Sequence, residues 1–252
     1  MKFFGATDTG LVRKANQDSY IIAFNETGDV FVIVCDGIGG SNAGDVASMT
    51  AINYLSNAFS VTHGFSSEEQ LMGWMKEHLS KANDEVFTLS TTRKEYHGMG
   101  TTLVGLVVCH FGCFVVNVGD SRCYGYFKNG VFRCCTVDHN LLNDLVRSGE
   151  ATVEEAQKNK QRNYLTNALG VWNSIKVDVF KIKDPVDTFL LCTDGLHGYV
   201  AESDIEKMIC DDHLSLQNKN KQLIQLAMQS GGYDNTTVVL VKMEEGDMQW
   251  KK

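Results

Sequence analysis

The stretch FVIVCDGIGGSNAGD, residues 31–45, passes from five apolar residues to an aspartate and then into a glycine-rich loop. A short continuous apolar run is typical of a buried β-strand. The glycines that follow allow a backbone to approach another group closely. Asp36 is therefore expected at the rigid end of a buried strand, beside a loop with few side chains. This arrangement indicates a site, provided that other segments bring partners to Asp36.

The composition excludes several classes of partner. The chain has 252 residues, 43% of them hydrophobic, and a formal net charge of −8 without a cluster of lysine and arginine. Neither nucleic acid nor a membrane surface is therefore expected as a partner. Neither a signal peptide nor a membrane-spanning segment is expected, because the apolar stretch near residue 1 is too short and no run approaches membrane-spanning length. The eight cysteines form no C-x-x-C pair, which favours buried free thiols over a zinc site. We expect one cytoplasmic domain over residues 1–252.

The periodicity of apolar residues predicts strands and helices in groups. The short turns between residues 102 and 136 favour an antiparallel meander. A helix is expected to begin at a capping box formed by Ser66 and Glu69, and Lys219 and Lys221 are expected on a solvated helix face. The predicted strands are 19–24, 29–35, 102–109, 113–119, 122–127, 131–135, 188–192 and 236–243, and further helices are expected at 43–58, within 139–163, near 203–210 and at 216–229. The pattern predicts an α+β sandwich in which helices cover stacked sheets.

Five aspartates lie where predicted strands begin or end. Asp36 and Asp194 follow strands, Asp18 and Asp234 precede strands, and Asp120 lies between two of them. Aspartate is an ordinary turn residue, but turn aspartates are usually flanked by polar residues and do not end hydrophobic strands. The repeated placement predicts that the carboxylates converge.

Converging carboxylates require cations. Two of them about 5 Å apart repel by roughly 3 kcal/mol at an effective dielectric constant near 20, so either their pKa values rise or metal binds. Oxygen ligands without histidine or cysteine at metal-ligand spacing favour Mg²⁺ or Mn²⁺ over zinc. Asp36 would bridge two ions about 3.5–4 Å apart, holding a hydroxide suited to in-line attack on phosphorus. Gly37 would bring a carbonyl close enough to act as a ligand.

Eight motifs occur in the order found in metal-dependent protein phosphatases of the 2C type. They are GLVRKANQDSY, VCDGIGG, GMGTTL, VNVGDSRCYGY, VDHNLL, YLTNALG, LLCTDGL and GGYDNTTVVLV. Over about residues 5–241 the chain resembles the short bacterial members of this family. The resemblance implies an α-β-β-α sandwich of two mainly antiparallel sheets flanked by helix pairs, with a flap at about residues 139–170. It also implies a hydrolase that removes phosphate from serine and threonine on proteins.

The resemblance assigns metal ligands residue by residue. Asp36 matches the aspartate that bridges two metal ions, and Gly37 matches the residue that supplies a carbonyl ligand. The other implied ligands are Asp194 and Asp234 for the first ion, Asp18 for the second and Asp120 for a third, weaker site. Two to three Mn²⁺ or Mg²⁺ ions are therefore the implied cofactors.

The resemblance also implies how phosphate and partners are recognised. Arg13 matches the arginine that grips the substrate phosphate, a role suited to a planar, permanently charged guanidinium. The expected substrates are phosphorylated proteins, the targets of a serine/threonine kinase in signal transduction. The enzyme is expected to be a monomer.

Three positions depart from the family pattern, and at one of them Gln17 replaces a glutamate, a variation that bacterial members tolerate. Ser41 replaces a histidine proposed as the general acid, whose loss typically costs about 10²–10⁴ in rate. A metal-bound water and His197 are the candidates to replace it. Asn167 stands where an arginine is common. Ser41 motivates an alternative, a catalytically weak phosphatase-like regulatory or binding module, although a binding module would not need to keep a repulsive carboxylate cluster. A sigma-factor pathway regulator would share the chemistry and differ only in partner.

Overall fold

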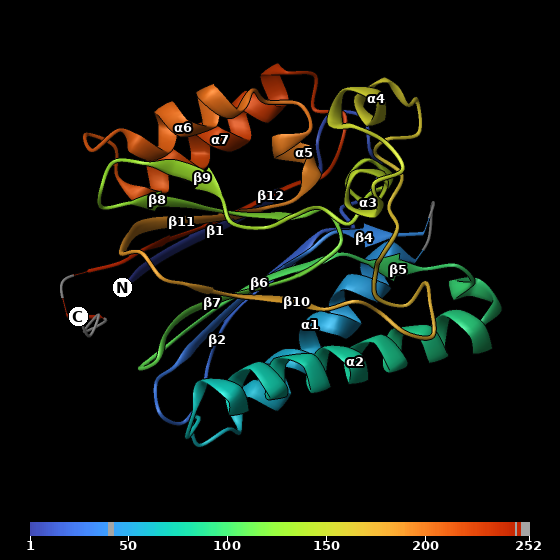
Figure 1. Cartoon of the computed structure of the whole chain (residues 1–252), viewed down its shortest axis with the longest axis horizontal. Helices are drawn as coiled ribbons and strands as arrows, with labels where there is room; N and C mark the ends of the chain where they lie inside the picture. Colours follow the sequence, from blue (N-terminus) through green and yellow to red (C-terminus); the bar gives the residue numbers. More distant parts are fainter. Residues whose placement is uncertain (40–42, 245, 248–252) are drawn as a thin grey trace.

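Two five-stranded antiparallel sheets lie face to face in the computed structural model, which describes residues 1–39, 43–244 and 246–247 (Figure 1). The first sheet has the order β1-β12-β11-β8-β9, with β1 Lys2–Asp8, β8 Arg122–Phe127, β9 Phe132–Cys134, β11 Val186–Cys192 and β12 Thr236–Lys242. The second has the order β10-β7-β6-β3-β2, with β2 Ser19–Phe24, β3 Val30–Cys35, β6 Leu103–Cys109, β7 Gly112–Val118 and β10 Asp178–Ile182. A short pair, β4 Gly37–Ile38 and β5 Gly100–Thr101, continues beyond the second sheet.

Helices cover both outer faces of the sandwich (Figure 1). The second sheet is covered by α1 Gly44–Ser60 and α2 Glu68–Thr92, and the first by α6 Glu202–Cys210 and α7 Leu216–Gln229. Three shorter helices, α3 Leu141–Ser148, α4 Val153–Lys158 and α5 Asp194–His197, lie at one end of the sandwich, and a 3₁₀ turn, η1 Lys94–Tyr96, follows α2. The α-β-β-α layering expected from the resemblance is confirmed.

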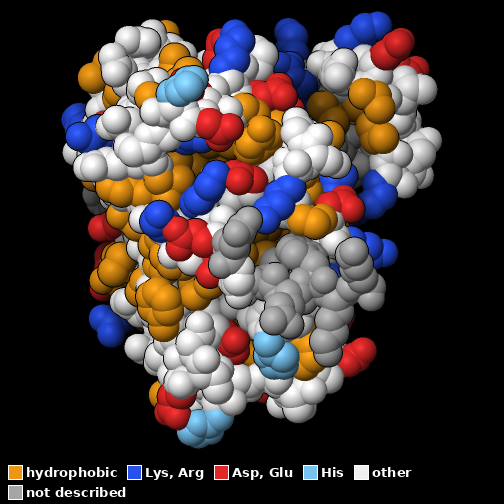
Figure 2. Space-filling model, turned by 90° about the vertical axis from the view of Figure 1, so that its left-hand side faces the viewer, with side chains coloured by type: hydrophobic (Ala, Val, Ile, Leu, Met, Phe, Trp, Pro, Cys, Tyr) orange, Lys and Arg blue, Asp and Glu red, His pale blue; other side chains and the backbone are white. Residues whose placement is uncertain are grey.

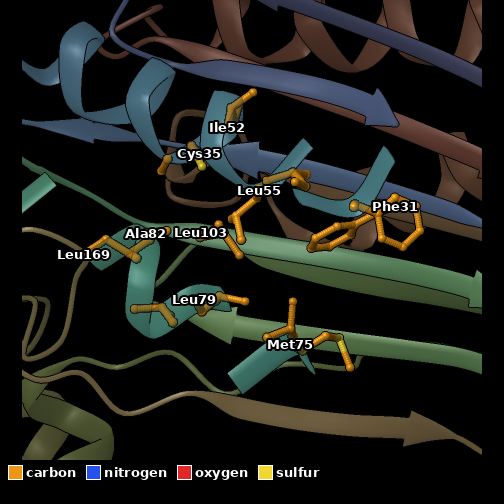
Figure 3. Close-up of a cluster of buried hydrophobic side chains, with 14 of the residues drawn as sticks. Phe31, Cys35, Ile52, Leu55, Met75, Leu79, Ala82, Leu103 and Leu169 are labelled. Carbon is orange, nitrogen blue, oxygen red and sulfur yellow. The ribbon is translucent and has the colours of Figure 1, made fainter. Parts of the chain in front are cut away.

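Strand β3 is buried on both faces, which explains its unbroken apolar sequence. Alternate residues Val30, Val32 and Val34 face the other sheet. Phe31, Ile33 and Cys35 point the other way, into the core beneath α1 and α2 (Figure 3). The core around Phe31 and Cys35 includes Leu55 of α1 and Met75 and Leu79 of α2. Asp36 therefore lies at the end of a strand that is buried on both faces.

The predicted single meander is wrong. Strands β6 and β7 form a hairpin in the second sheet, whereas β8 and β9 form a hairpin in the first. The chain crosses between the sheets at residues 119–121, the turn that carries Asp120. Since both faces of these strands are covered, their apolar pattern could not indicate which sheet each strand joins.

Three further differences concern the edges of the fold. The edge strands β1 and β10 were not predicted, although β1 pairs with β12 over seven residues. The N-cap of α2 is Ser67, whose side chain accepts a hydrogen bond from the backbone of Gln70, and not Ser66. Lys219 is buried, at 4% exposure, and donates to the carbonyl of Ile209 in the last turn of α6. A lysine so placed stabilises unpaired carbonyls at a helix end.

The two ends of the sandwich differ. The chain termini lie at the end opposite α3 and α5 (Figure 1). Figure 2 views that face, where hydrophobic side chains reach the surface among interspersed basic and acidic ones. Of the described helices, none combines the length and the apolar character that a membrane span requires.

Candidate active site

A pocket of about 280 Å³ opens at the end of the sandwich where the predicted aspartates lie. Six predicted residues line it: Arg13, Asp36, Gly37, Asp120, Asp194 and Asp234. They come from five separate segments of the chain: Arg13 from the loop between β1 and β2, Gly37 from the short β4, and the aspartates from beside the ends of strands in both sheets. The structure therefore brings together all of the predicted site residues except Asp18, which lies behind the pocket wall.

The backbone of Asp36 is fixed by hydrogen bonds to two threonines. Its N–H donates to Oγ1 of Thr102, and its carbonyl accepts from the backbone N–H of Thr102 and the hydroxyl of Thr101. Gly37 is required for close packing, since a Cβ there would lie 2.1 Å from the carbonyl oxygen of Gly44. The close backbone approach predicted at this glycine is thus an approach to another segment of the same chain.

Asp18 lies under the site. Its Oδ2 accepts hydrogen bonds from the hydroxyls of Thr193 (2.8 Å) and Thr237 (2.7 Å), residues at the ends of β11 and β12. Its Oδ1 is buried and has no hydrogen-bond partner among the residues that the structure describes. Burial raises the pKa of Asp18 to about 7 despite the two hydroxyls, and the neighbouring Asp194 and Asp234 add to the rise.

Two histidines hold the turn that carries Asp120. His197 donates from Nε2 to the carbonyl of Asp120 at 3.0 Å, and His139 accepts at Nδ1 from the N–H of Gly119. Burial lowers the pKa of His197 to about 4, so it is neutral at pH 7. His197 does not line the pocket. A neutral, buried histidine whose N–H is already used is not suited to protonate a leaving group, and its role as the replacement acid is not supported.

Asp194 and Asp234 lie at the same end of the antiparallel β11–β12 pair. Asp194 is the first residue of α5, and its Oδ1 is buried without a hydrogen-bond partner within the described chain. Asp234 precedes β12; its Oδ1 accepts from the N–H of Asn235, and its Oδ2 accepts from Arg13 at 2.7 Å. The guanidinium of Arg13 is half exposed, so it remains accessible from solvent.

The carboxylates raise one another's pKa values. Burial raises that of Asp36 well above its usual range, and the charges of Asp18, Asp194 and Asp120 add to the effect. Burial and Asp234 raise that of Asp194, and burial raises that of Asp120 to about 7. Such a group is stable either with bound protons or with a cation in their place.

The donor set fits a hard divalent cation. The pocket offers carboxylate and carbonyl oxygens, the ligands that Mg²⁺ and Mn²⁺ prefer. The buried Oδ1 atoms of Asp18 and Asp194, which the described residues leave without partners, have lone pairs to give. Across the described ranges no three acidic, histidine or cysteine side chains form a ready-made metal site, so the side chains would have to turn toward an ion.

Three positioning residues were missed from the sequence. Asn235 accepts from the N–H of Gln17 and donates to the carbonyls of Thr9 and Ala15, which fixes the loop that carries Arg13. The hydroxyl of Thr102 lies 2.7 Å from that of Ser121, joining the turns of Asp36 and Asp120. Each of the three missed residues, Gln17, Thr102 and Asn235, lines the pocket. Their polar type and position next to the aspartates or in a Thr-Thr pair was the available signal.

Ser41 and Asn167, two of the departures from the family pattern, have different outcomes. Ser41 lies outside the described residues. Asn167 is buried; its Nδ2 lies 2.7 Å from Nδ1 of His139, and its amide exchanges hydrogen bonds with the backbone of Lys176. It thereby ties the segment 139–170 to Lys176, two residues before β10, and Leu165 of this segment reaches the pocket. Asparagine at this position serves as an internal brace.

Comparisons with known proteins agree with this geometry. The family model for protein phosphatase 2C matches residues 12–229. The chain is 37% identical over 239 residues to the serine/threonine phosphatase Stp of Listeria monocytogenes, covering 94% of each chain. It is 33% identical over 244 residues to the protein phosphatase PhpP of Streptococcus pneumoniae, covering 96% of this chain and 98% of the relative. The crystal structure of Stp1 from Staphylococcus aureus superposes with a TM-score of 0.87 at 32% identity, covering 96% of this chain and 95% of that chain. The chain therefore belongs to the protein phosphatase 2C family.

Proposed function

We propose that this divalent-metal-dependent serine/threonine protein phosphatase binds two to three Mn²⁺ or Mg²⁺ ions in the pocket and hydrolyses phosphoserine and phosphothreonine there. One observation carries the proposal: four aspartates with no cation but Arg13 among the pocket-lining residues surround a single pocket. A pocket of like charges is expensive to maintain. It is understandable in a phosphatase, where bound cations meet the phosphate.

Each carboxylate has a place in this proposal. Asp36 would be the ligand shared by two ions, and Gly37 would offer its carbonyl. Asp194 and Asp234 would hold the first ion, Asp120 would hold a third more weakly, and Oδ1 of Asp18 would be the oxygen available to the second. The raised pKa values of Asp18 and Asp120, both about 7, support a role in which protons give way to cations near neutral pH.

The protein's own residues orient the substrate. Arg13 would donate hydrogen bonds to two oxygens of the phosphate, in place of its contact with Asp234 or in addition to it. This would hold the phosphorus over the carboxylate cluster. When bound, the cations supply positive charge to the phosphate oxygens and make water a stronger nucleophile. Ser41 cannot protonate the leaving oxygen near neutral pH, so substrates with good leaving groups are expected to react faster than phosphoserine.

The biological setting follows from the same proposal. The substrates would be proteins phosphorylated by a serine/threonine kinase. The enzyme would act as a monomer and would bind neither nucleic acid nor a membrane. All eight cysteines lie within the described residues and none of them forms a disulfide there, which favours the reducing cytoplasm. The segment 139–170 would act as the flap of one catalytic domain, because Leu165 reaches the pocket.

The proposal is tested by exchanging one carboxylate. Asp36→Asn is expected to abolish Mn²⁺-dependent hydrolysis of a phosphothreonine peptide while the protein stays folded. The matched control is Asp29→Asn at the other end of β3, where the carboxylate is also buried but hydrogen-bonds only Asn25 and Thr27. The control should retain activity. Retention of more than a few per cent of activity by Asp36→Asn would contradict the central role of Asp36.

A further inference from the structure

Four exposed hydrophobic side chains adjoin the charged rim of the pocket. Leu11 and Val12 lie in the loop before β2, Tyr199 follows α5, and Tyr233 precedes β12. They are exposed by 72%, 60%, 42% and 54% respectively. We name this group the tyrosine patch. Single exposed apolar residues are ordinary, whereas contiguous ones mark contact sites.

Backbone contacts make the patch continuous. The N–H groups of Leu11 and Val12 both donate to the carbonyl of Gly232, at 2.8 and 3.3 Å. The rings of Tyr199 and Tyr233 lie 5.5 Å apart at an angle of 40°. The loop before β2 and the loop before β12 therefore run side by side, and the second of them joins the α5 segment through its tyrosine.

The patch is also continuous with the pocket. Val12 is followed by Arg13, and Tyr233 is followed by Asp234, so each loop places a hydrophobic residue next to a pocket-lining charged one. The 2.7 Å hydrogen bond from Arg13 to Asp234 joins the two loops at this point. The charges of Asp194 and Asp234 contribute to a raised pKa of Tyr199, after burial as the main cause, which agrees with a ring close to the site.

The patch is shaped before any ligand arrives. Gly231 has a φ of +121°, and a Cβ on it would lie 2.2 Å from the ring of Tyr233. Gly232 has a φ of +53°, and a Cβ there would lie 2.8 Å from Cγ of Leu11. Tyr233 and Leu11 thus pack onto the backbone of a glycine pair, which fixes their position and lowers the entropy lost on binding.

We propose that the tyrosine patch is a subsite for an apolar side chain of the phosphoprotein substrate, one or two residues from the phosphorylated serine or threonine. The proposal rests on the function proposed above, because that function places the phosphate at Arg13. An extended peptide advances about 3.3 Å per residue, so a neighbour of the phosphorylated residue comes within reach of rings that begin one residue from Asp234. Aromatic rings offer area to leucine or phenylalanine and little to serine.

Binding of peptides with a non-hydrolysable phosphonate analogue of phosphothreonine tests the subsite. In Mn²⁺, peptides with leucine at position −2, −1, +1 or +2 and serine elsewhere are compared with the all-serine peptide by fluorescence anisotropy. The wild-type protein is expected to bind at least one leucine peptide about fivefold to tenfold more tightly, the size expected for an apolar contact in a half-open site. Tyr233→Ser and Tyr199→Ser should reduce this ratio to near one, while Tyr233→Phe keeps it.

The matched control is Phe24→Ser. Phe24 is as exposed as Tyr233, at 53%, but lies at the end of β2 away from Asp18, so its loss should leave the ratio unchanged. A wild-type ratio near one at every position would overturn the proposal without any variant, as would serine variants that keep the preference. Turnover of p-nitrophenyl phosphate by the wild-type protein is measured separately. Its absence with every cation would refute the proposed function, while the binding ratio would still decide the subsite.

Discussion

The guanidinium of Arg13 donates a 2.7 Å hydrogen bond to Oδ2 of Asp234, joining the predicted phosphate-binding residue to a predicted metal ligand. This hydrogen bond raises the pKa of Arg13 further above its usual value. A bound cation would compete with Arg13 for this carboxylate oxygen, and a bound phosphate would compete with Asp234 for the guanidinium. Loading the site would therefore change the partners of both groups together.

Replacing Arg13 by alanine should separate substrate binding from turnover. We expect Arg13→Ala to raise KM for phosphopeptides about 10- to 100-fold, because two charged hydrogen bonds to phosphate are lost, with a smaller effect on kcat. Arg13→Lys should fall between, since lysine keeps the charge without the fork. Steady-state kinetics measures both, and an unchanged KM for Arg13→Ala would refute the phosphate-binding role.

The same variant should bind cations more tightly. Without Arg13, Asp234 loses the positive partner that competes with a metal ion. Isothermal titration with Mn²⁺ should therefore show a lower Kd for Arg13→Ala than for the wild-type protein. A higher Kd would mean that Arg13 supports cation binding and does not compete with the cation for Asp234.

Restoring the histidine at position 41 tests the general-acid argument. Ser41→His is expected to raise kcat on a phosphoserine peptide more than on p-nitrophenyl phosphate, whose leaving group needs little protonation. Parallel assays of the two substrates give the ratio. Equal gains would show that the proton comes from another source.

His197 is predicted to be a positioning residue. His197→Asn should lower the free energy of unfolding by about 1–3 kcal/mol, since the carbonyl of Asp120 loses a buried hydrogen bond. Turnover of phosphopeptide and p-nitrophenyl phosphate should fall by a similar factor. A selective loss on phosphopeptide would instead indicate that His197 is the general acid.

Stability should depend on pH in a direction set by the carboxylates. The pKa values of Asp18 and Asp120 are raised from 3.8 to about 7, so the folded chain holds these protons at a pH where the unfolded chain has released them. Their contribution to cation-free stability is therefore fully present below about pH 4 and is lost as pH rises through 7. His197 has the opposite pH dependence, because its pKa is lowered from 6.5 to about 4. The contribution of this single group to stability is lost as pH falls from 6.5 to 4.

Cations should reverse the pH trend. Because Mn²⁺ replaces the protons, the difference between Tm in Mn²⁺ and Tm in EDTA should grow from pH 5 to pH 8. Thermal unfolding at fixed ionic strength measures this difference. A constant or shrinking difference would show that cations do not bind the titrating carboxylates.

The sequence was most informative where one segment settles its own structure. The apolar run at β3 identified a buried strand and placed Asp36 at its end, and the strand edges carrying Asp194 and Asp234 were found in the same way. The layering followed from helix and strand periodicity together with the resemblance. These features depend on local pattern, which a sequence displays directly.

The features that the sequence could not show depend on contacts between distant segments. Asp18 lies beneath the pocket because Thr193 and Thr237, far along the chain, donate to it. The crossing at Asp120 depends on which sheet each hairpin joins, and strands buried on both faces carry no such information. His197 looked available because it follows the predicted metal ligand Asp194 closely in sequence, yet its ring nitrogen is used inside the fold.

Hydrolysis by the purified protein tests the central claim most directly. p-Nitrophenyl phosphate and a phosphothreonine peptide would be incubated with Mn²⁺, with Mg²⁺ or with EDTA, and released product and phosphate measured. We expect turnover of both substrates that requires a cation and is abolished by EDTA. A folded protein that shows no turnover with either cation, or turnover indifferent to EDTA, would contradict it.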